Sequence, residues 1–286
     1  MLYKIYEEET DKTYNLSIVE IINLIKLNSS NTFYKFINNK NNENNENNEN
    51  NENNENNENN ENNENNENNE NNEKKIKINN NIVLNTKFIC HRINTIEELK
   101  TIDNQFGIEL DLRDDHKSNK IILSHDPFLQ GEFFEDYLQN YKHNTLILNI
   151  KSERIELECL KLLEKYNINN YFFLDSSFPM IYLLNKEYNN NKIACRFSEY
   201  EPIENFLNIS HMYEYIWVDC FSKFPLTTEI FNLIKNENQN KKKICIVSPE
   251  LQKQPEKIEE YRDYIISNNI FPDLICCKSY NIIRWI

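Results

Sequence analysis

Glycine is almost absent from this sequence, with 2 residues in a chain of 286. An open, doubly wound α/β sheet usually carries a glycine-rich phosphate loop after its first strand. No stretch of this sequence supplies such a loop. The lack of glycine therefore disfavours a doubly wound nucleotide-binding fold.

Paired cysteines are also lacking. The seven cysteines include no C-x-x-C spacing, and most of them lie inside apolar, strand-like runs. An odd count without paired spacing argues against a disulfide framework and against a zinc site. We expect reduced cysteines in a protein core, and hence a reducing compartment and a cytoplasmic protein.

The sequence has no long apolar run, and its start lacks the basic, apolar and small-residue succession of a signal peptide. Its longest apolar stretch, residues 15–27, is interrupted by Glu20, Asn23 and Lys26. A membrane-spanning helix needs about 20 consecutive apolar residues. We therefore predict a packed amphipathic helix in this stretch and no transmembrane segment.

A basic surface is missing as well. The chain has 46 acidic and 32 basic residues, for a formal charge of −14. Residues 41–73 repeat the tripeptide Asn-Asn-Glu eleven times, so 35 acids remain against 32 bases elsewhere. A near-neutral body with one short lysine cluster, at 241–243, offers no electrostatic footprint for nucleic acid or an anionic membrane. We expect no nucleic-acid partner, and the sequence points to no protein partner.

The Asn-Asn-Glu repeat divides the chain. It has no apolar residue to bury and a regular run of like charge, so we predict a disordered spacer over residues 41–81. An N-terminal helical segment, residues 1–40, precedes it. A compact domain, residues 82–286, follows it.

Within 82–286, short β-branched or aromatic runs alternate with helical stretches, which is the pattern of βαβ units around a parallel sheet. The predicted strands are 82–92, 107–113, 120–126, 145–151, 171–177, 192–198, 215–221, 243–249 and 273–278. The predicted helices between them include 95–102, 153–166, 228–235 and 256–267. Nine strands are one more than a (β/α)8 TIM-type barrel needs, and about 205 residues is short for that fold, but the barrel fits best.

Most of these strands end in a polar residue, and the carboxyl ends of barrel strands are where barrel enzymes keep their chemistry. The strand-end residues are His91, Asp111, His125, Lys151, Asp175, Arg196 and Asp219.

The strand at 107–113 carries three charged residues on one face. Alternation along the strand places Glu109, Asp111 and Arg113 together. If this face points into a barrel, adjacent carboxylates require a counter-ion, and Mg²⁺ or Ca²⁺ is the usual one. The alternative is a half-exposed strand with a polar outer face.

Two histidines end strands on either side of that strand. Imidazoles on opposite sides of a phosphodiester can act as general base and general acid, because their pKa lies near the working pH. We predict His91 and His125 in these roles. Arg92 and Lys151 are predicted to neutralise phosphoryl oxygens, and Arg113 is a third candidate for this role. His116, His143 and His211 are expected to be structural or surface residues.

These residues carry a resemblance. The succession His91-Arg92, Asn94-Thr95, Glu109-x-Asp111, His125-Asp126 and Asn149-Ile150-Lys151 resembles the glycerophosphodiester phosphodiesterase family and the wider phospholipase-C-like phosphodiesterases. The resemblance is strongest over residues 88–151 and covers none of 1–81. It implies a (β/α) barrel, a small phosphodiester substrate, His91 and His125 as the catalytic pair, and a divalent metal on Glu109 and Asp111.

The chain departs from that family's pattern in the segment after His91-Arg92 and at one metal ligand. Ile93 stands where the family usually has glycine and a longer loop, so the rim near the substrate is shortened. Asn149 stands where the family usually has glutamate. Its carbonyl oxygen can bind a metal but adds no charge, so we expect weaker metal affinity. Arg196, Glu199 and Asp219 are further candidates for the rim of the site.

Two other functions stay open at this point. A phospholipase-C- or sphingomyelinase-like lipase would need an apolar rim, and residues 127–138, with Phe128, Phe133 and Phe134, are the stretch that might supply one. A non-catalytic barrel that binds phosphorylated ligands is the other, and Asn149 is its best support. The two histidines and the Glu-x-Asp pair favour the enzyme.

Overall fold

The computed structural model describes residues 2–7, 12–27, 34–37, 86–236 and 242–286. The chain divides into two compact units, Met1–Ile78 and Asn79–Ile286. The predicted spacer, residues 41–81, and the start of the predicted strand at 82–92 lie outside the described residues.

The first unit is a small sheet with a helix. Strand β1 (Leu2–Glu7) pairs antiparallel with β2 (Lys12–Ser17) and with β3 (Tyr34–Ile37). Helix α1 (Ile18–Leu27) lies within the predicted helical stretch and buries Ile21, Ile22 and Ile25. The description of residues 1–40 as a helical segment was incomplete, because strands of four to six residues are too short to give a clear alternation in the sequence.

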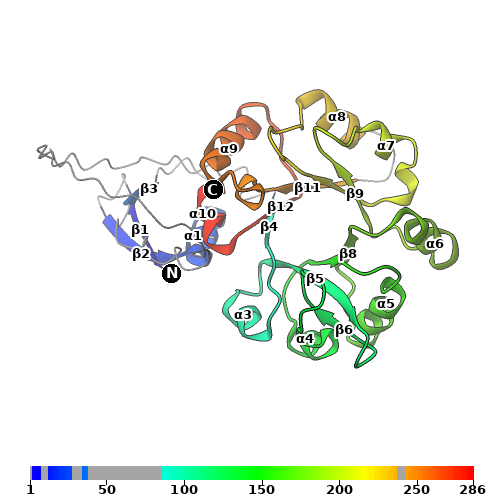
Figure 1. The fold of residues 1–286 in the computed structure, drawn as a ribbon. Coiled ribbons are helices and arrows are strands. Elements are labelled where there is room, and N and C mark those ends of the chain that lie inside the picture. Colours follow the sequence, from blue (N-terminus) through cyan, green and yellow to red (C-terminus); the bar gives the residue numbers. More distant parts are fainter. Residues whose placement is uncertain (1, 8–11, 28–33, 38–85, 237–241) are drawn as a thin grey trace, which may run out of the picture. The chain divides into compact units, whose positions relative to one another are not determined.

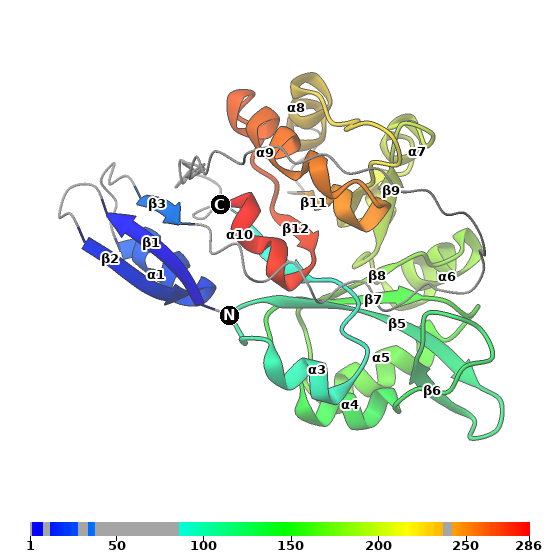
Figure 2. The same cartoon turned by 60° about the vertical axis from the view of Figure 1, so that its left-hand side comes forward.

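The second unit is a parallel barrel (Figures 1 and 2). The strands follow the order β8-β7-β5-β4-β12-β11-β10-β9, and each neighbouring pair is parallel. A single bridge between Phe173 and Ile193 joins the two end strands, so the barrel is nearly closed. This is the predicted TIM-type order. The strands are β4 (Lys87–Cys90), β5 (Gly107–Asp115), β7 (Leu146–Ile150), β8 (Tyr171–Leu174), β9 (Ala194–Phe197), β10 (Tyr215–Val218), β11 (Lys243–Val247) and β12 (Leu274–Cys277).

The ninth predicted strand is outside the barrel. Strand β6 (Lys120–Leu123) pairs antiparallel with the end of β5, from Leu112 opposite Leu123 to Asp115 opposite Lys120. A connection as short as 116–119 can join only antiparallel strands, since a parallel pair needs a crossover of about a dozen residues or more. The prediction placed this strand correctly along the chain but assigned it wrongly to the barrel, so His125 follows a hairpin strand.

Helices cover the outside of the barrel (Figure 2). Helix α3 begins with a capping box, in which Thr95 Oγ1 accepts from the Glu98 backbone N–H at 3.1 Å and Glu98 Oε2 accepts from the Thr95 N–H at 3.1 Å. The α-helices of this unit are α3 (Ile96–Thr101), α4 (Phe134–Asn140), α5 (Glu156–Lys165), α6 (Phe178–Tyr188), α7 (Glu204–Leu207), α8 (Thr228–Asn236), α9 (Ile258–Ser267) and α10 (Ile282–Trp285). Of these, α3, α5, α8 and α9 correspond to predicted helices.

The barrel interior is packed with alternate residues of its strands, including Ile89, Ile147, Phe172, Trp217 and Cys276. The same alternation directs the last residue of several strands to the interior at the carboxyl end. The fold thereby collects strand-end side chains at one mouth.

Gly107 is required by this packing. A methyl group built on its Cα would lie 2.2 Å from Ile89 Cδ1 and 2.7 Å from the carbonyl oxygen of Thr145. The backbone contact cannot move as a side-chain end can, so Gly107→Ala should lower the free energy of unfolding by about 1–3 kcal/mol, the usual cost of overpacking. Urea denaturation of Gly107→Ala beside the unsubstituted protein measures this loss; an unchanged midpoint would contradict the packing described.

Candidate active site

Glu109 and Asp111 occupy the centre of the barrel mouth. Both side chains are buried, with 1% and 0% of their surface exposed. In the register of β5 and β7, Glu109 is opposite Ile147 and Asp111 is opposite Asn149. Because Ile147 belongs to the interior core, this face of β5 is the interior face. The polar outer face considered from the sequence is therefore excluded.

Glu109 is held from two sides. Its Oε1 accepts a hydrogen bond from Asn149 Nδ2 at 2.9 Å, and its Oε2 accepts one from the Arg92 backbone N–H at 2.7 Å. Arg92 has a φ of 55°, a left-handed conformation that is uncommon outside glycine and clusters at functional sites. Burial raises the pKa of Glu109, and the bonds from Asn149 and Arg92 oppose that rise. The site thus holds a carboxylate that is costly to leave without a cation.

Asp111 is positioned by Asn94. This residue belongs to the Asn94-Thr95 motif of the sequence, but the motif predicted no role for it. Asn94 Nδ2 donates to Asp111 Oδ2 at 3.0 Å, and Asn94 Oδ1 accepts from the Asp111 backbone N–H at 2.9 Å. Arg92 Nε lies 3.5 Å from the same Oδ2. Burial and the charge of Glu109 raise the pKa of Asp111. Asn94 therefore fixes one carboxylate oxygen and leaves the other without a hydrogen bond among the described residues.

His91 follows β4 and faces this pair, with Nε2 at 3.7 Å from Glu109 Oε2. Its side chain is 16% exposed, and its Nδ1 is buried without a hydrogen-bond partner. Burial, together with the charges of Lys278 and Arg92, lowers the pKa of His91 to about 3 against the opposing effect of Asp111. The ring is therefore neutral near pH 7 and available to accept a proton.

The pKa of His91 makes a pH-dependent contribution to stability. Because the folded-state value of about 3 is below the ordinary value of about 6.5, the unfolded chain binds the extra proton more readily. Stability should fall as pH decreases from about 6.5 towards 3. We expect His91→Gln to remove up to a few kcal/mol of this loss, at about 1.4 kcal/mol per pKa unit. Chemical denaturation in EDTA at several pH values tests it, and parallel curves for both proteins would contradict it.

Two buried oxygens in the site lack hydrogen-bond partners. They are Asp111 Oδ1 and Asn149 Oδ1, on residues that face each other across β5 and β7. Carboxylate and amide oxygens are the ligands that Mg²⁺ and Ca²⁺ prefer. Among the described residues, no group of three or more His, Cys, Asp and Glu side chains is arranged to hold a metal. The oxygens open to a hard cation are therefore Asp111 Oδ1 and Asn149 Oδ1, and the buried Glu109 lies beside them, bonded to Asn149.

His125 lies at the same mouth but contacts other groups. The Ser124 backbone N–H donates to the carbonyl of Asp111 at 3.0 Å, which fixes the segment at the end of β5. His125 Nδ1 is 2.7 Å from Asp126 Oδ1, and this bond lowers the pKa of Asp126. No hydrogen bond or ion pair joins His125 to His91, Glu109 or Asp111 in the part of the chain that the structure describes. The two histidines therefore share one end of the barrel without touching.

The guanidinium of Arg113 donates its hydrogen bonds to backbone carbonyls. Its Nε and Nη2 donate to the carbonyl of His125 at 3.1 and 2.9 Å, and its Nη1 donates to the carbonyl of Lys151 at 2.9 Å. Phosphate binding by Arg113 stays a prediction. The observed bonds instead tie the His125 segment to the end of β7.

The predicted rim residues are also engaged. Arg196 pairs with Asp175 and with buried Asp219. Glu199 accepts from Ser222 Oγ at 2.8 Å and from the Phe221 N–H at 3.2 Å. Burial alone would raise the pKa of Glu199, but its hydrogen bonds lower it overall. Glu199 thus holds the loop at 221–223, and Arg196 and Asp219 form an ion pair.

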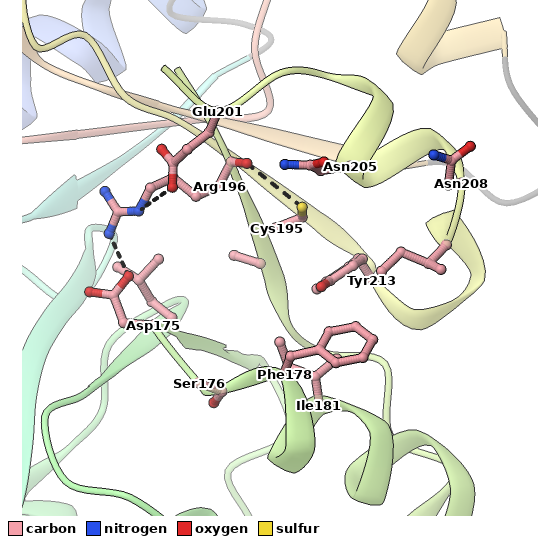
Figure 3. A pocket seen from close by; sticks show the side chains of 13 residues that line it. Asp175, Ser176, Phe178, Ile181, Cys195, Arg196, Glu201, Asn205, Asn208 and Tyr213 are labelled. Carbon is pink, nitrogen blue, oxygen red and sulfur yellow. Dashed lines mark hydrogen bonds and ion pairs between the residues drawn. The ribbon is translucent and has the colours of Figure 1, made fainter. Parts of the chain in front are cut away.

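A cavity of about 540 Å³ opens beside Arg196, at the seam between β8 and β9 (Figure 3). Apolar Leu174, Ile181 and Ala194 line it together with polar groups. His91, Glu109 and Asp111 are not among its lining residues. Asp175 belongs to its wall and also contacts Lys151, which contacts Asp111, so two successive ion pairs join the cavity to the carboxylate site.

Solved structures with a similar fold are known. A glycerophosphoryl diester phosphodiesterase from Parabacteroides distasonis ATCC 8503 has a TM-score of 0.47 and 15% identity, with 66% of this chain and 81% of that chain covered. The chain resembles it in fold. A glycerophosphodiester phosphodiesterase from Agrobacterium tumefaciens str. C58 has a TM-score of 0.44 and 13% identity, covering 67% and 96%. No family model and no curated protein matches the chain. Since identity to these phosphodiesterases is this low, the function has to be argued from the side chains.

Lys278 is a residue of the mouth that sequence reasoning missed. It follows β12 and continues the alternation of interior residues Leu274 and Cys276. Its charge lowers the pKa of His91. The strand-end pattern that selected Lys151 applies equally to Lys278, so that signal was present in the sequence.

The predicted apolar rim is small. Phe128 is 103% exposed and Leu129 is also exposed, whereas Phe134 is buried in α4. Lys120 Nζ lies over the ring of Phe133 at 4.6 Å. In the described part of the chain, no helix is long and apolar enough to cross a membrane. Two exposed apolar side chains are a weak basis for a lipase that works at a bilayer.

Proposed function

We propose that this protein is a metal-dependent phosphodiesterase that hydrolyses a small glycerophosphodiester. The observation that carries the proposal is the half-buried His91, 3.7 Å from the first of two buried carboxylates, with Arg92 and Lys151 next to them. A general base, a cation site and two positive side chains are what in-line displacement at a phosphodiester requires. The fold supports the proposal because barrel enzymes react at this end of the strands.

Substrate binding uses the positive charges of the mouth. Arg92 is 43% exposed, so its guanidinium can turn to a phosphoryl oxygen with a fork of two donors. Lys151 Nζ lies 3.7 Å from Asp111 Oδ1, at the edge of the carboxylate pair. The cavity beside Asp175 and Arg196 has room for the alcohol part of the diester.

Asp111 and Asn149 would hold a divalent cation, Mg²⁺ or Ca²⁺, through their two oxygens that have no hydrogen-bond partner, and Glu109 would add its negative charge. When bound, such a cation neutralises negative charge that develops on phosphoryl oxygens. Asn94 keeps Asp111 in place by its two hydrogen bonds. Because Asn149 adds no charge, two carboxylates would supply all the negative charge at the cation site.

The two histidines move the protons. His91 Nε2 takes a proton from a hydroxyl group next to the phosphate, and the oxygen of that hydroxyl attacks phosphorus. The bond from phosphorus to the second alcohol breaks, and His125 Nε2 protonates the leaving oxygen. Asp126 holds the other nitrogen of His125, so Nε2 is left for this step. Water then opens the resulting cyclic phosphate, with the two proton transfers reversed.

A turnover assay tests the proposal. Purified protein is incubated with a panel of glycerophosphodiesters and lysophospholipids in Mg²⁺, Ca²⁺, Mn²⁺ or EDTA. We expect hydrolysis of small glycerophosphodiesters in a divalent cation, none in EDTA, and a loss of rate in His125→Ala. Inactivity across the panel, or unchanged activity of His125→Ala, would overturn it. Inactivity together with tight binding of glycerophosphodiesters would indicate a non-catalytic barrel instead.

A further inference from the structure

A chain of alternating charges crosses the mouth of the barrel. Lys151 Nζ lies 3.7 Å from Asp111 Oδ1 and 3.4 Å from Asp175 Oδ2. Asp175 Oδ1 accepts a hydrogen bond from Arg196 Nη2, and Arg196 Nη1 donates to Asp219 Oδ2. Figure 3 shows the guanidinium of Arg196 close to Asp175 at one wall of the cavity. Lys151 is therefore shared between the buried carboxylate of Asp111 and the partly exposed carboxylate of Asp175.

Asp175 is fixed from its far side. Arg196, which occupies Asp175 Oδ1, is itself bound by Asp219, and Asp219 is buried. The second oxygen of Asp219 accepts from Gln252 Nε2 at 2.8 Å and from the Cys220 N–H at 3.0 Å. A buried, fully bonded anchor of this kind cannot shift cheaply. Asp175 Oδ2 is thus presented to Lys151 from a fixed position.

The other partner of Lys151 has an oxygen to spare. Asp111 Oδ1 is buried and has no hydrogen-bond partner. In the proposed function this oxygen is a cation ligand. An ammonium group that closed on it would compete with the cation, because both positive charges use the same oxygen. A second carboxylate that also binds Lys151 keeps its ammonium group 3.7 Å from this oxygen, beyond hydrogen-bond distance.

We infer that Asp175 is a positioning residue that keeps Lys151 from closing to hydrogen-bond distance on Asp111 Oδ1, and so preserves that oxygen as a ligand for a divalent cation. The inference rests on the proposed function, since it gives Asp111 the cation-binding role. Asp175 is not among the residues proposed to hold the cation. Its effect on cation binding is transmitted through Lys151.

Asp175→Asn is the test variant, because asparagine keeps the shape and removes the charge. Asp175 has a φ of 61°, and asparagine tolerates this left-handed region well, so the variant should fold. Calorimetric titration with Mn²⁺ should show affinity about tenfold lower than in the unsubstituted protein, the loss usual when a partner behind a metal ligand is removed. Excess cation should restore most of the hydrolytic rate.

Two controls identify the route. Glu201→Gln removes a carboxylate that lies 3.7 Å from the guanidinium of Arg196. No ion pair joins this carboxylate to Lys151 among the described residues, so the variant should leave Mn²⁺ affinity unchanged. In a Lys151→Met background, Asp175→Asn should have no further effect on Mn²⁺ affinity. Unchanged affinity in Asp175→Asn, or an equal loss with and without Lys151, would overturn the inference while leaving the proposed function intact. A chain that binds no Mn²⁺ before any substitution would overturn both.

Discussion

His91→Gln is expected to lower kcat for a glycerophosphodiester by about 10² to 10⁴, the usual contribution of a general base. Burial and the charges of Lys278 and Arg92 keep His91 neutral. The ring is therefore unprotonated over the whole neutral range, which is the state that a general base must start from. Glutamine preserves size and polarity but cannot take up a proton, so KM should change much less than kcat.

His143→Gln is the matched control for this loss. His143 is a half-buried histidine whose Nε2 is 2.9 Å from the carbonyl of Ile102, and no role in the site is assigned to it. Its substitution should leave kcat within about twofold, because substitutions away from special features usually have small effects. Initial rates at saturating Mg²⁺ compare the three proteins. A full rate in His91→Gln would remove His91 from the chemistry.

Asp111→Asn is expected to abolish cation-dependent turnover and, in EDTA, to raise the free energy of unfolding at pH 7 by on the order of 1 kcal/mol. Burial and Glu109 raise the pKa of Asp111, which means that the fold favours an uncharged group at this position. The bond from Asn94 survives in the amide, because an amide oxygen can accept it. Lys151 keeps Asp175 as its partner.

Thermal unfolding in EDTA and in about 10 mM Mg²⁺ measures both the stability without the cation and the stabilisation by it. The unsubstituted protein should gain stability from the cation, because a ligand that binds only the folded state stabilises it. Asp111→Asn should show a higher midpoint in EDTA and no gain from Mg²⁺. Asp114→Asn, on the exposed hairpin, should behave like the unsubstituted protein. A normal Mg²⁺ response in Asp111→Asn would rule out Asp111 as a ligand.

The barrel was predictable from sequence because its signals are local. Alternation within short strands, helices between them and polar strand ends all follow from the two-residue period of a strand. The pairing partner of β6 was not predictable from that pattern. An apolar run followed by His125-Asp126 looks the same whether it joins a barrel or folds back on β5, and only the short turn at 116–119 distinguishes the cases.

The site was predictable to the level of which residues gather, but not what each one contacts. Glu109, Asp111 and His91 come together because they alternate inward on neighbouring strands. Arg113 alternates onto the same face of β5 as Glu109 and Asp111. Its guanidinium nevertheless binds two carbonyls that lie 12 and 38 residues away along the chain. Such long-range hydrogen bonds leave no periodic trace in a sequence. The same holds for Glu199 and its loop.

The most direct measurement is a ³¹P NMR time course of a glycerophosphodiester with the unsubstituted protein and Mg²⁺ at pH 7. The proposed proton transfers by His91 and His125 predict that the diester signal passes through a cyclic phosphate to a monoester. An analogue without the hydroxyl next to the phosphate should remain intact. Equal cleavage of the analogue, or no loss of the diester, would contradict the proposed chemistry.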